Sequence, residues 1–312
     1  MLINDFFNNV IAKGIELDPR EKEYIITEVM KDEYGFQNEF EQKFSIDEKV
    51  KNPYFDTMIY NIANENMNKI MIGIDIDTEE LKMAKDSGID TVISYNPFGK
   101  ALLNSWKTVD IYKFELMQAG VLKTIIFKLV NNLQKKLQLD LLTKNYIKEI
   151  NKAKQLNLNF LTLHSPVDNY THDYIKKTLY DCDELNLKEV VAKILQIFEY
   201  KISQKNGAHP IIYQYNDQQQ KLGKAFIKFN GGVLNNKDIF KYLKEAGITT
   251  FITHHLPFSH IEKAHKYEIN VILCPRIAGN NLGLNLILND IFNDKNEEIE
   301  IFETAGFLRN KL

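Results

Sequence analysis

The chain has 312 residues, long enough to bury one large core or two medium ones. Its content of 44% hydrophobic and 26% charged residues is typical of a soluble globular protein. The formal net charge of −3 argues against a nucleic-acid-binding surface, because such proteins usually carry a clear basic excess.

The sequence also predicts a cytoplasmic location. It contains two cysteines, so no disulfide framework is implied and a reducing compartment is expected. The opening residues MLINDFFNNV lack the basic region of a signal peptide. The most apolar stretch, residues 121–130, contains Lys123 and Lys128 and is too short to cross a bilayer. We therefore expect no contact with a membrane.

Residues 1–67 predict a mostly helical region. Asp18 is followed by Pro19 and Glu21, which combines an N-cap acid, a proline at the first helical position and a glutamate at the third. This pattern predicts a helix that starts at Asp18.

A repeated segment follows this region. Residues 69–98 (KIMIGIDIDTEELKMAKDSGIDTVISYNPF) and residues 224–258 (KAFIKFNGGVLNNKDIFKYLKEAGITTFITHHLPF) are similar. Each predicts a strand, a turn, an amphipathic helix that ends at a glycine, a second strand, and a polar loop with a proline. Asp77 and Asn235 provide the helix starts. The repeat predicts an α/β fold of two pseudo-symmetric halves.

The loops that leave the second strands are the expected place for chemistry. In α/β proteins, ligands bind beyond the carboxyl ends of parallel strands. One loop is Tyr95-Asn96-Pro97, and the other is His254-His255-Leu256-Pro257. We expect both loops to open toward a shared cleft.

Between the two copies, the sequence predicts three helices, over residues 121–139, 142–156 and 187–202, and a strand over residues 160–163. No linker rich in glycine, proline or serine separates them, which favours interlocked halves. The expected domains are a helical region at 1–67, a first α/β half with a helical insertion at 68–205, and a second half at 206–312.

Four motifs together resemble one known family. They are IGIDIDTEELKMAKDSGIDTVISYNP, LTLHSPVD, NGGVLNNKDIFKYLKEAGITTFITHHLPFSHIEKAH and VILCPRIAGNN. Their order is similar to that of the NGG-interacting-factor-three family, also called the GTP cyclohydrolase I type 2 homologue family. The resemblance covers residues 69–307 with gaps. It implies two similar α/β halves, a ring-shaped homo-oligomer, and two adjacent metal ions in a cleft between the halves.

The chain departs from the metal motifs that this resemblance implies. The family has a His-His pair where this chain has Tyr95 and Asn96. It has a histidine and, four residues later, a glutamate where this chain has Arg276 and Asn280. Two close divalent ions need several carboxylate or imidazole donors. We therefore expect no two-metal centre, and we expect these four side chains to line the cleft and contact any small molecule there.

A site for one ion is a separate hypothesis. The middle motif of the family is retained as His164 and Asp168. The second repeat carries His255 and His260, which could converge if the loop turns back at Pro257. The family has a histidine near the position of His260. These four side chains could hold one divalent ion of zinc, iron or nickel.

A metal-free interpretation is also open, and we favour it slightly. His254 and His255 are adjacent on a strand and should face opposite sides, and His265 should lie on the surface. Asp168 could be a turn or N-cap residue for a helix that begins near His172.

Asn230-Gly231-Gly232 raises a similar choice between a functional and a structural role. A glycine pair between a strand and a helix can cradle an anion with backbone amides. The commoner explanation for such a pair is a tight turn.

Two functions follow. The first is a non-catalytic binding or scaffold protein that retains the fold and has lost the two metals. The second is a metal-dependent hydrolase acting on a small phosphorylated or nucleotide-like compound, with Arg276 pairing an anionic group. The chain shows no Walker motif or Gly-x-Gly-x-x-Gly fingerprint, and no eightfold repeat typical of a (β/α)-barrel.

Overall fold

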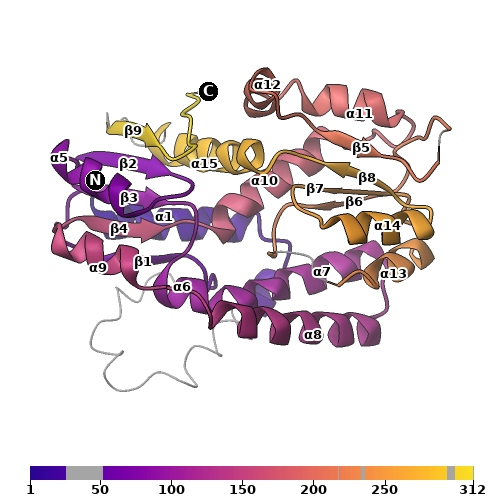
Figure 1. Cartoon of the computed structure of the whole chain (residues 1–312), viewed down its shortest axis with the longest axis horizontal. Helices are drawn as coiled ribbons and strands as arrows, with labels where there is room; N and C mark the ends of the chain where they lie inside the picture. Colours follow the sequence, from indigo (N-terminus) through magenta and orange to yellow (C-terminus); the bar gives the residue numbers. More distant parts are fainter. Residues whose placement is uncertain (26–51, 217, 233–235, 294–298, 312) are drawn as a thin grey trace. The chain divides into compact units, whose positions relative to one another are not determined.

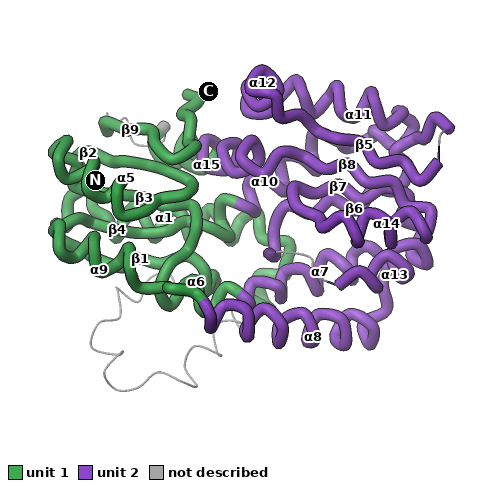
Figure 2. Tube along the Cα trace, viewed as in Figure 1, with its two compact units in different colours: residues 1–105, 144–167, 286–312 green, residues 106–143, 168–285 purple. Residues whose placement is uncertain are grey.

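The computed structural model describes residues 1–25, 52–216, 218–232, 236–293 and 299–311. The chain divides into two compact units, one of residues 1–105, 144–167 and 286–312 and the other of residues 106–143 and 168–285 (Figure 2). Each unit contains one sheet.

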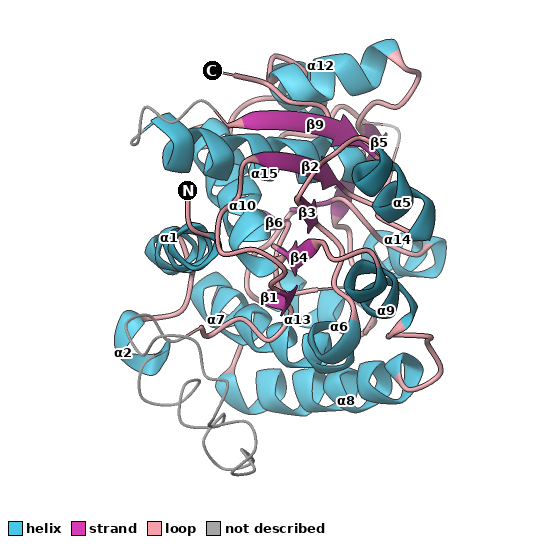
Figure 3. Cartoon of the chain, turned by 90° about the vertical axis from the view of Figure 1, so that its left-hand side faces the viewer, coloured by secondary structure: helices cyan, strands magenta, loops and turns pink. Residues whose placement is uncertain are grey.

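The sheet of the first unit has the strand order β1-β4-β3-β2-β9 (Figure 3). Its strands are β1 (Met58–Asn61), β2 (Lys69–Gly73), β3 (Thr91–Ser94), β4 (Asn159–Thr162) and β9 (Glu300–Thr304). Strands β2, β3, β4 and β9 run parallel, and β1 pairs antiparallel with β4. Because these strands are parallel, the carboxyl ends of β2, β3 and β4 lie at the same end of the sheet.

The sheet of the second unit has the order β5-β8-β7-β6 (Figure 1). Its strands are β5 (Ile211–Tyr213), β6 (Ala225–Lys228), β7 (Thr250–Thr253) and β8 (Asn270–Leu273). Strands β6, β7 and β8 run parallel, and β5 pairs antiparallel with β8. This sheet therefore matches the first one strand by strand, with β9 as an addition to the first.

The predicted repeat is confirmed in structure. Residues 69–98 form β2, α5 (Thr78–Asp86) and β3, and residues 224–258 contain β6, α13 (Ile239–Glu245) and β7. In both copies the two strands pair in parallel. The α/β fold of two pseudo-symmetric halves is thus correct.

The start of α5 follows the sequence signal. The Asp77 carboxylate accepts a hydrogen bond from the Glu79 N–H at 2.6 Å, and Glu80 accepts one from the Asp77 N–H at 2.9 Å. This reciprocal capping box satisfies backbone donors at the helix start. Asn235 lies outside the described residues, and α13 begins after Asp238.

The helix predicted to start at Asp18 is wrong in its starting residue. Helix α2 (Lys22–Tyr24) begins after Glu21, which makes no side-chain cap. The Asp18 carboxylate instead accepts hydrogen bonds from the backbone and the guanidinium of Arg20, the shortest at 2.7 Å. Arg20 is buried and needs a charged partner, so the Asp18 carboxylate pairs with its guanidinium and does not cap the helix.

Two other helix boundaries differ from the predictions. The helix expected over residues 187–202 is two helices, α11 (Leu187–Ile194) and α12 (Phe198–Lys205), because Ile197 adopts an extended conformation and is buried. Helix α10 (Ser165–Thr178) begins well before His172. Proline is well tolerated in a first helical turn, so the Ser-Pro pair there does not delay the start.

The remaining helices are α1 (Ile3–Glu16), α6 (Gly99–Asn104), α7 (Val109–Ala119), α8 (Lys123–Leu141), α9 (Lys148–Gln155), α14 (Phe258–Lys266) and α15 (Arg276–Asn293). The expected domains were contiguous ranges, at 1–67, 68–205 and 206–312, whereas each compact unit gathers segments far apart in the chain. Strand β1 belongs to the first sheet, and α7 and α8 pack on the core of the second unit. Among the described helices, none is both long and apolar enough to span a bilayer.

Helix α7 covers the edge of the second sheet along β6. At one end, Lys224 Nζ donates to the Ala119 carbonyl at 3.0 Å. Further along, the Tyr112 ring lies 6.0 Å from the Phe226 ring, edge to face. A side chain at Gly231 would meet the backbone of Tyr112 at 3.2 Å. A helix that runs beside an edge strand shields it from pairing with other chains.

One buried asparagine offers a test of the first sheet. Asn159 Oδ1 accepts the Ala63 and Asn64 N–H groups at 2.8 and 2.9 Å, and its Nδ2 donates to Thr91 Oγ1 at 3.0 Å. Asn159→Ala leaves the Ala63 and Asn64 N–H groups without this acceptor, whereas the Thr91 hydroxyl keeps its hydrogen bond to Asp90. We therefore expect a loss of about 2–3 kcal/mol in the free energy of unfolding, measured with urea.

Asn270 is the matched control, because it occupies the same place in the second sheet. Its Oδ1 accepts one long hydrogen bond, 3.4 Å from the Tyr215 N–H. We expect Asn270→Ala to cost about 1 kcal/mol. Equal losses in the two variants would contradict this account.

Candidate functional site

Two predicted site residues meet at the carboxyl ends of β3 and β4. Tyr95 follows β3 and His164 follows β4, and their rings lie 4.7 Å apart. They meet because β3 and β4 are parallel neighbours. Tyr95 is 3% exposed, whereas the His164 side chain is 19% exposed. The imidazole is thus the more accessible of the two groups.

A buried carboxylate orients this imidazole. His164 Nδ1 lies 2.9 Å from Asp56 Oδ2, and the Ser165 hydroxyl donates to the same oxygen at 2.8 Å. The Thr57 hydroxyl donates to Asp56 Oδ1 at 3.2 Å. Asp56 is fully buried, so these donors replace the water that an ionised carboxylate requires.

The electrostatics of the pair favour a charged Asp56. Burial by itself raises the pKa of Asp56, but the charge of His164 and the hydrogen bonds from His164 and Ser165 outweigh it, so the pKa lies below its ordinary value of 3.8. When His164 is neutral, a carboxylate at Nδ1 holds the remaining proton on that nitrogen and leaves the lone pair on Nε2. Such an imidazole can act as a base or as a metal ligand.

Sequence reasoning missed Asp56. It lies 108 residues before His164 and precedes β1. The antiparallel pairing of β1 with β4, in which Met58 faces Thr162, brings it to the site. No local motif marks this pairing, since it depends on two strands far apart in the chain.

Asn96 is held by a different carboxylate. Its side-chain amide donates to Asp75 Oδ1, and its carbonyl accepts hydrogen bonds from the hydroxyls of Ser94 and Thr162 at 2.9 and 3.1 Å. These contacts fix the loop after β3. At the two positions where the family has a His-His pair, this chain therefore has a buried aromatic ring and an amide bound to Asp75.

The other predicted site residues belong to the second unit. Asp168 and Asn280 are buried in α10 and α15, and Arg276 opens α15 partly exposed. His255 is exposed after β7, whereas His260 is 7% exposed in α14. Those residues are thus distributed over α10, α14, α15 and the loop after β7.

Two further histidines lie near His255 and His260, one after β7 and the other in α14. His254 packs its ring 5.5 Å from the Phe229 ring. His265, expected on the surface, is partly buried, with Nε2 3.1 Å from the Tyr213 carbonyl oxygen.

These positions do not assemble a metal-binding cluster within the described part of the chain. No three side chains of His, Cys, Asp or Glu are grouped there so that they could hold an ion. A two-ion centre also does not fit the donor set, because Tyr95 and Asn96 supply a buried phenol and an engaged amide. The single-ion site stays a prediction.

A second cluster of polar groups surrounds Lys228 at the end of β6. The ammonium donates to the Asn230 carbonyl at 2.7 Å and to the Gly232 carbonyl, and lies 5.1 Å from the centre of the Tyr112 ring. Gly231 and Gly232 both have positive φ, of 69° and 74°, which other residues rarely adopt. These contacts describe a tight turn held by a buried lysine.

Burial also changes the chemistry of this lysine. It lowers the pKa of Lys228 to about 8, although the negative charges of Glu115 and Asp168 act in the opposite direction. Strongly shifted groups of this kind are enriched at functional sites, although structural networks contain them too.

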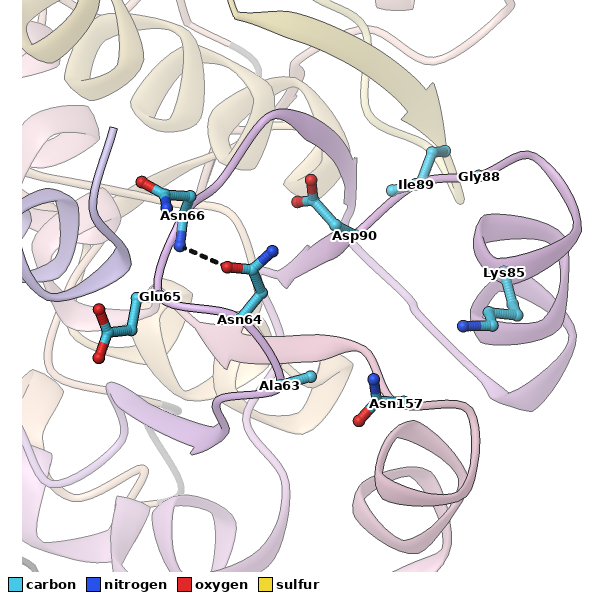
Figure 4. A pocket seen from close by; sticks show the side chains of 9 residues that line it. All are labelled: Ala63, Asn64, Glu65, Asn66, Lys85, Gly88, Ile89, Asp90 and Asn157. Carbon is cyan, nitrogen blue, oxygen red and sulfur yellow. Dashed lines mark hydrogen bonds between the residues drawn. The ribbon is translucent and has the colours of Figure 1, made fainter.

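A hollow of about 580 Å³ lies elsewhere (Figure 4). Its lining residues are Ala63, Asn64, Glu65, Asn66, Lys85, Gly88, Ile89, Asp90 and Asn157. They precede β2, β3 and β4, so the hollow is at the amino ends of the strands. Of its two carboxylates, Glu65 is exposed, and Asp90 already accepts hydrogen bonds from the Asn68 N–H and the Thr91 hydroxyl. We therefore place no chemistry there.

Comparison with solved structures identifies the fold. A NIF3 superfamily protein from Sphaerobacter thermophilus is similar, with a TM-score of 0.71, 22% identity, and coverage of 81% of this chain and 92% of that one. Reduced HcgD from Methanocaldococcus jannaschii is similar at a TM-score of 0.51 and 13% identity, over 85% of this chain and 94% of that one. NIF3 abbreviates NGG-interacting factor three, so the resemblance is confirmed at the level of the fold. No family model and no curated protein sequence matches the chain.

The Asp56–His164 pair predicts a stability loss. Asp56→Asn removes one charge of a buried hydrogen-bonded pair, so we expect a loss of about 3–5 kcal/mol in the free energy of unfolding at neutral pH. Because the folded pKa of Asp56 lies below 3.8, its contribution is present above that pH and is lost as the pH falls further.

Urea unfolding between about pH 3 and pH 7 measures both effects. The control is Asp86→Asn, since Asp86 is an exposed carboxylate of the same unit. We expect it to cost less than about 1 kcal/mol. A loss in Asp56→Asn that is no larger than in the control would refute the role of Asp56.

Lys228 predicts a pH effect of the same sign as Asp56, at alkaline instead of acid pH. Between pH 8 and pH 10.5 the unfolded chain keeps a proton that native Lys228 releases, so the contribution of Lys228 to stability rises with pH. The rise is at most about 1.4 kcal/mol per pH unit. We therefore expect the parent to become more stable relative to Lys228→Met as the pH rises over this range, measured as the difference in their free energies of unfolding.

Only the difference between variants is informative here. Burial raises the pKa of the Cys274 thiol, which lowers the stability of all variants above about pH 9. Lys188→Met, at an exposed lysine, is the control and should show a constant difference from the parent. A constant difference for Lys228→Met would show that its pKa is not lowered.

Proposed function

We propose that this chain is a non-catalytic protein of the NIF3 fold that binds a small molecule without a two-ion centre. The observation that carries the proposal is the state of Tyr95 and Asn96 at the carboxyl end of β3. Tyr95 is 3% exposed against His164, and the Asn96 amide donates to Asp75. Neither can replace an imidazole ligand without breaking these contacts.

Electrostatics support the same conclusion in the second unit. Where the family has a histidine and a glutamate, this chain has Arg276 and Asn280. An arginine stays charged at all ordinary pH values, so it adds positive charge at a position that would otherwise bind a cation. It suits an anionic group of a small molecule instead.

A second function is favoured by the Asp56–His164 pair. A carboxylate behind an imidazole is the arrangement of many general bases and of most metal-binding histidines. The alternative is thus a hydrolase for a small phosphorylated or nucleotide-like compound. In it, one ion of zinc, iron or nickel is held by His164, Asp168, His255 and His260, and lowers the pKa of a bound water.

We also propose a cytoplasmic homo-oligomer that binds neither membranes nor nucleic acid. The modest net charge of −3 and the two buried, free cysteines support this proposal. A mass measurement in solution tests the oligomer, with a monomer as the contradicting result.

Metal analysis separates the two functions. Protein purified without chelators should contain no stoichiometric metal, and its melting temperature should not rise with added zinc, because a ligand stabilises a protein only if it binds the folded state. Two ions per chain would overturn the proposal.

The hydrolase alternative predicts a different result for the same experiment. It requires one ion per chain and a zinc-dependent rise in melting temperature that His164→Gln abolishes. His209→Gln is the matched control, since His209 is exposed, and it should retain the rise.

A further inference from the structure

A pocket of about 170 Å³ lies in the second unit between α7, α10 and β6. Glu115, Gln118 and Ala119 line it from α7, and His172 and Lys176 line it from α10. Residues 224–227 of the β6 segment and Ile248 form the remaining wall. The volume is below that of sites for drug-sized molecules, so only a fragment-sized ligand fits.

The wall of the pocket contains a buried histidine with unmet hydrogen-bonding capacity. His172 is 4% exposed, and neither Nδ1 nor Nε2 makes a hydrogen bond. Its Nε2 lies 3.2 Å from Glu115 Oε1, without the alignment of a hydrogen bond. Burial, with the charges of Lys176 and Lys228, lowers the pKa of His172 to about 3. The imidazole is therefore neutral, with one donor and one acceptor.

A polar side chain in this state has a cost. Burying an imidazole without hydrogen bonds sacrifices its hydration, whereas a leucine of similar size would sacrifice nothing. Local violations of this kind occur mainly at functional sites, where a ligand completes the hydrogen bonds.

The β6 wall offers a second set of hydrogen-bonding groups. The Lys224 carbonyl accepts a hydrogen bond from the Thr249 N–H, so the backbone groups of Lys224 face β7. Those of Phe226, two residues later in the strand, also face β7. The alternation along a strand then directs the N–H and C=O groups of Ala225 and Ile227 toward the pocket. These backbone groups supply both donors and acceptors, and an amide ligand offers a carbonyl acceptor and an N–H donor to match them.

The charges around the pocket disfavour an ionic ligand of either sign. Burial is the main reason why His172 is neutral, and the charges of Lys176 and Lys228 act in the same direction. The two lysines would also repel a cation. Glu115, which is 5% exposed, would repel an anion. A neutral ligand avoids both costs.

We propose that this pocket binds a neutral, fragment-sized amide or amide-like heterocycle, which hydrogen-bonds to His172, Glu115 and the edge of β6. Apolar parts of the ligand contact Ala119 and Ile248. This site is independent of the function proposed for the first unit, since all of its residues belong to the second.

Three ring compounds of equal size and different charge test the proposal with the full-length chain: benzamide, benzamidinium and benzoate. We expect saturable binding of benzamide by calorimetry or ligand-detected NMR, and at least tenfold weaker binding of the other two. No saturable binding of benzamide, or equal binding of all three, would overturn it.

Two variants locate the binding. His172→Leu should weaken benzamide binding at least about tenfold, because it removes one buried hydrogen-bonding partner. Its matched control, His209→Leu at an exposed histidine, should bind as the parent does. Gln118→Trp changes an exposed residue at the pocket, so the fold is retained while entry is blocked. If folded His172→Leu or Gln118→Trp bound benzamide as the parent does, the proposal would be contradicted.

Discussion

The parallel pairing of the repeated strands determines where the chemical groups of this protein lie. In each copy the first and second strands run in the same direction, so their carboxyl ends and the loops beyond them share one edge of the sheet. Adding β4 in parallel brings His164 beside Tyr95. Adding β1 in the opposite direction brings Asp56 behind His164. A shift of one residue in either register would turn these side chains to opposite faces.

The two halves differ most in how the outer edge of the sheet is covered. Strand β9 pairs with β2 in the first sheet, with Lys69 opposite Glu300. In the second sheet, α7 lies along the equivalent strand β6. A neighbouring strand forms backbone hydrogen bonds along the whole edge, whereas a helix covers the edge without such a ladder. The pocket beside β6 follows from this difference.

Local signals predicted the fold, and distant pairings determine the candidate site. The repeat and the capping box at Asp77 depend on residues close in sequence, and both were correct. Asp56 could not be found, because it lies 108 residues from His164 and reaches it only through the pairing of β1 with β4. The Asp18 prediction was wrong for a related reason. Its carboxylate had two possible partners, and the buried Arg20 is a stronger one than a helix N-terminus. Packing of this kind leaves no periodic trace in the sequence.

Lys228 and His172 are both buried basic side chains of the second unit, and their burial has different physical explanations. The Lys228 ammonium is met by two carbonyl groups and an aromatic ring, and it fixes a turn that requires two glycines at positive φ. Its burial is thus explained by the structure it stabilises. His172 is equally buried, yet neither nitrogen makes a hydrogen bond. Because an apolar residue would fill the same space at lower cost, the fold alone gives no reason for an imidazole there. The reason lies in the adjoining pocket, where a bound molecule would supply the missing partners.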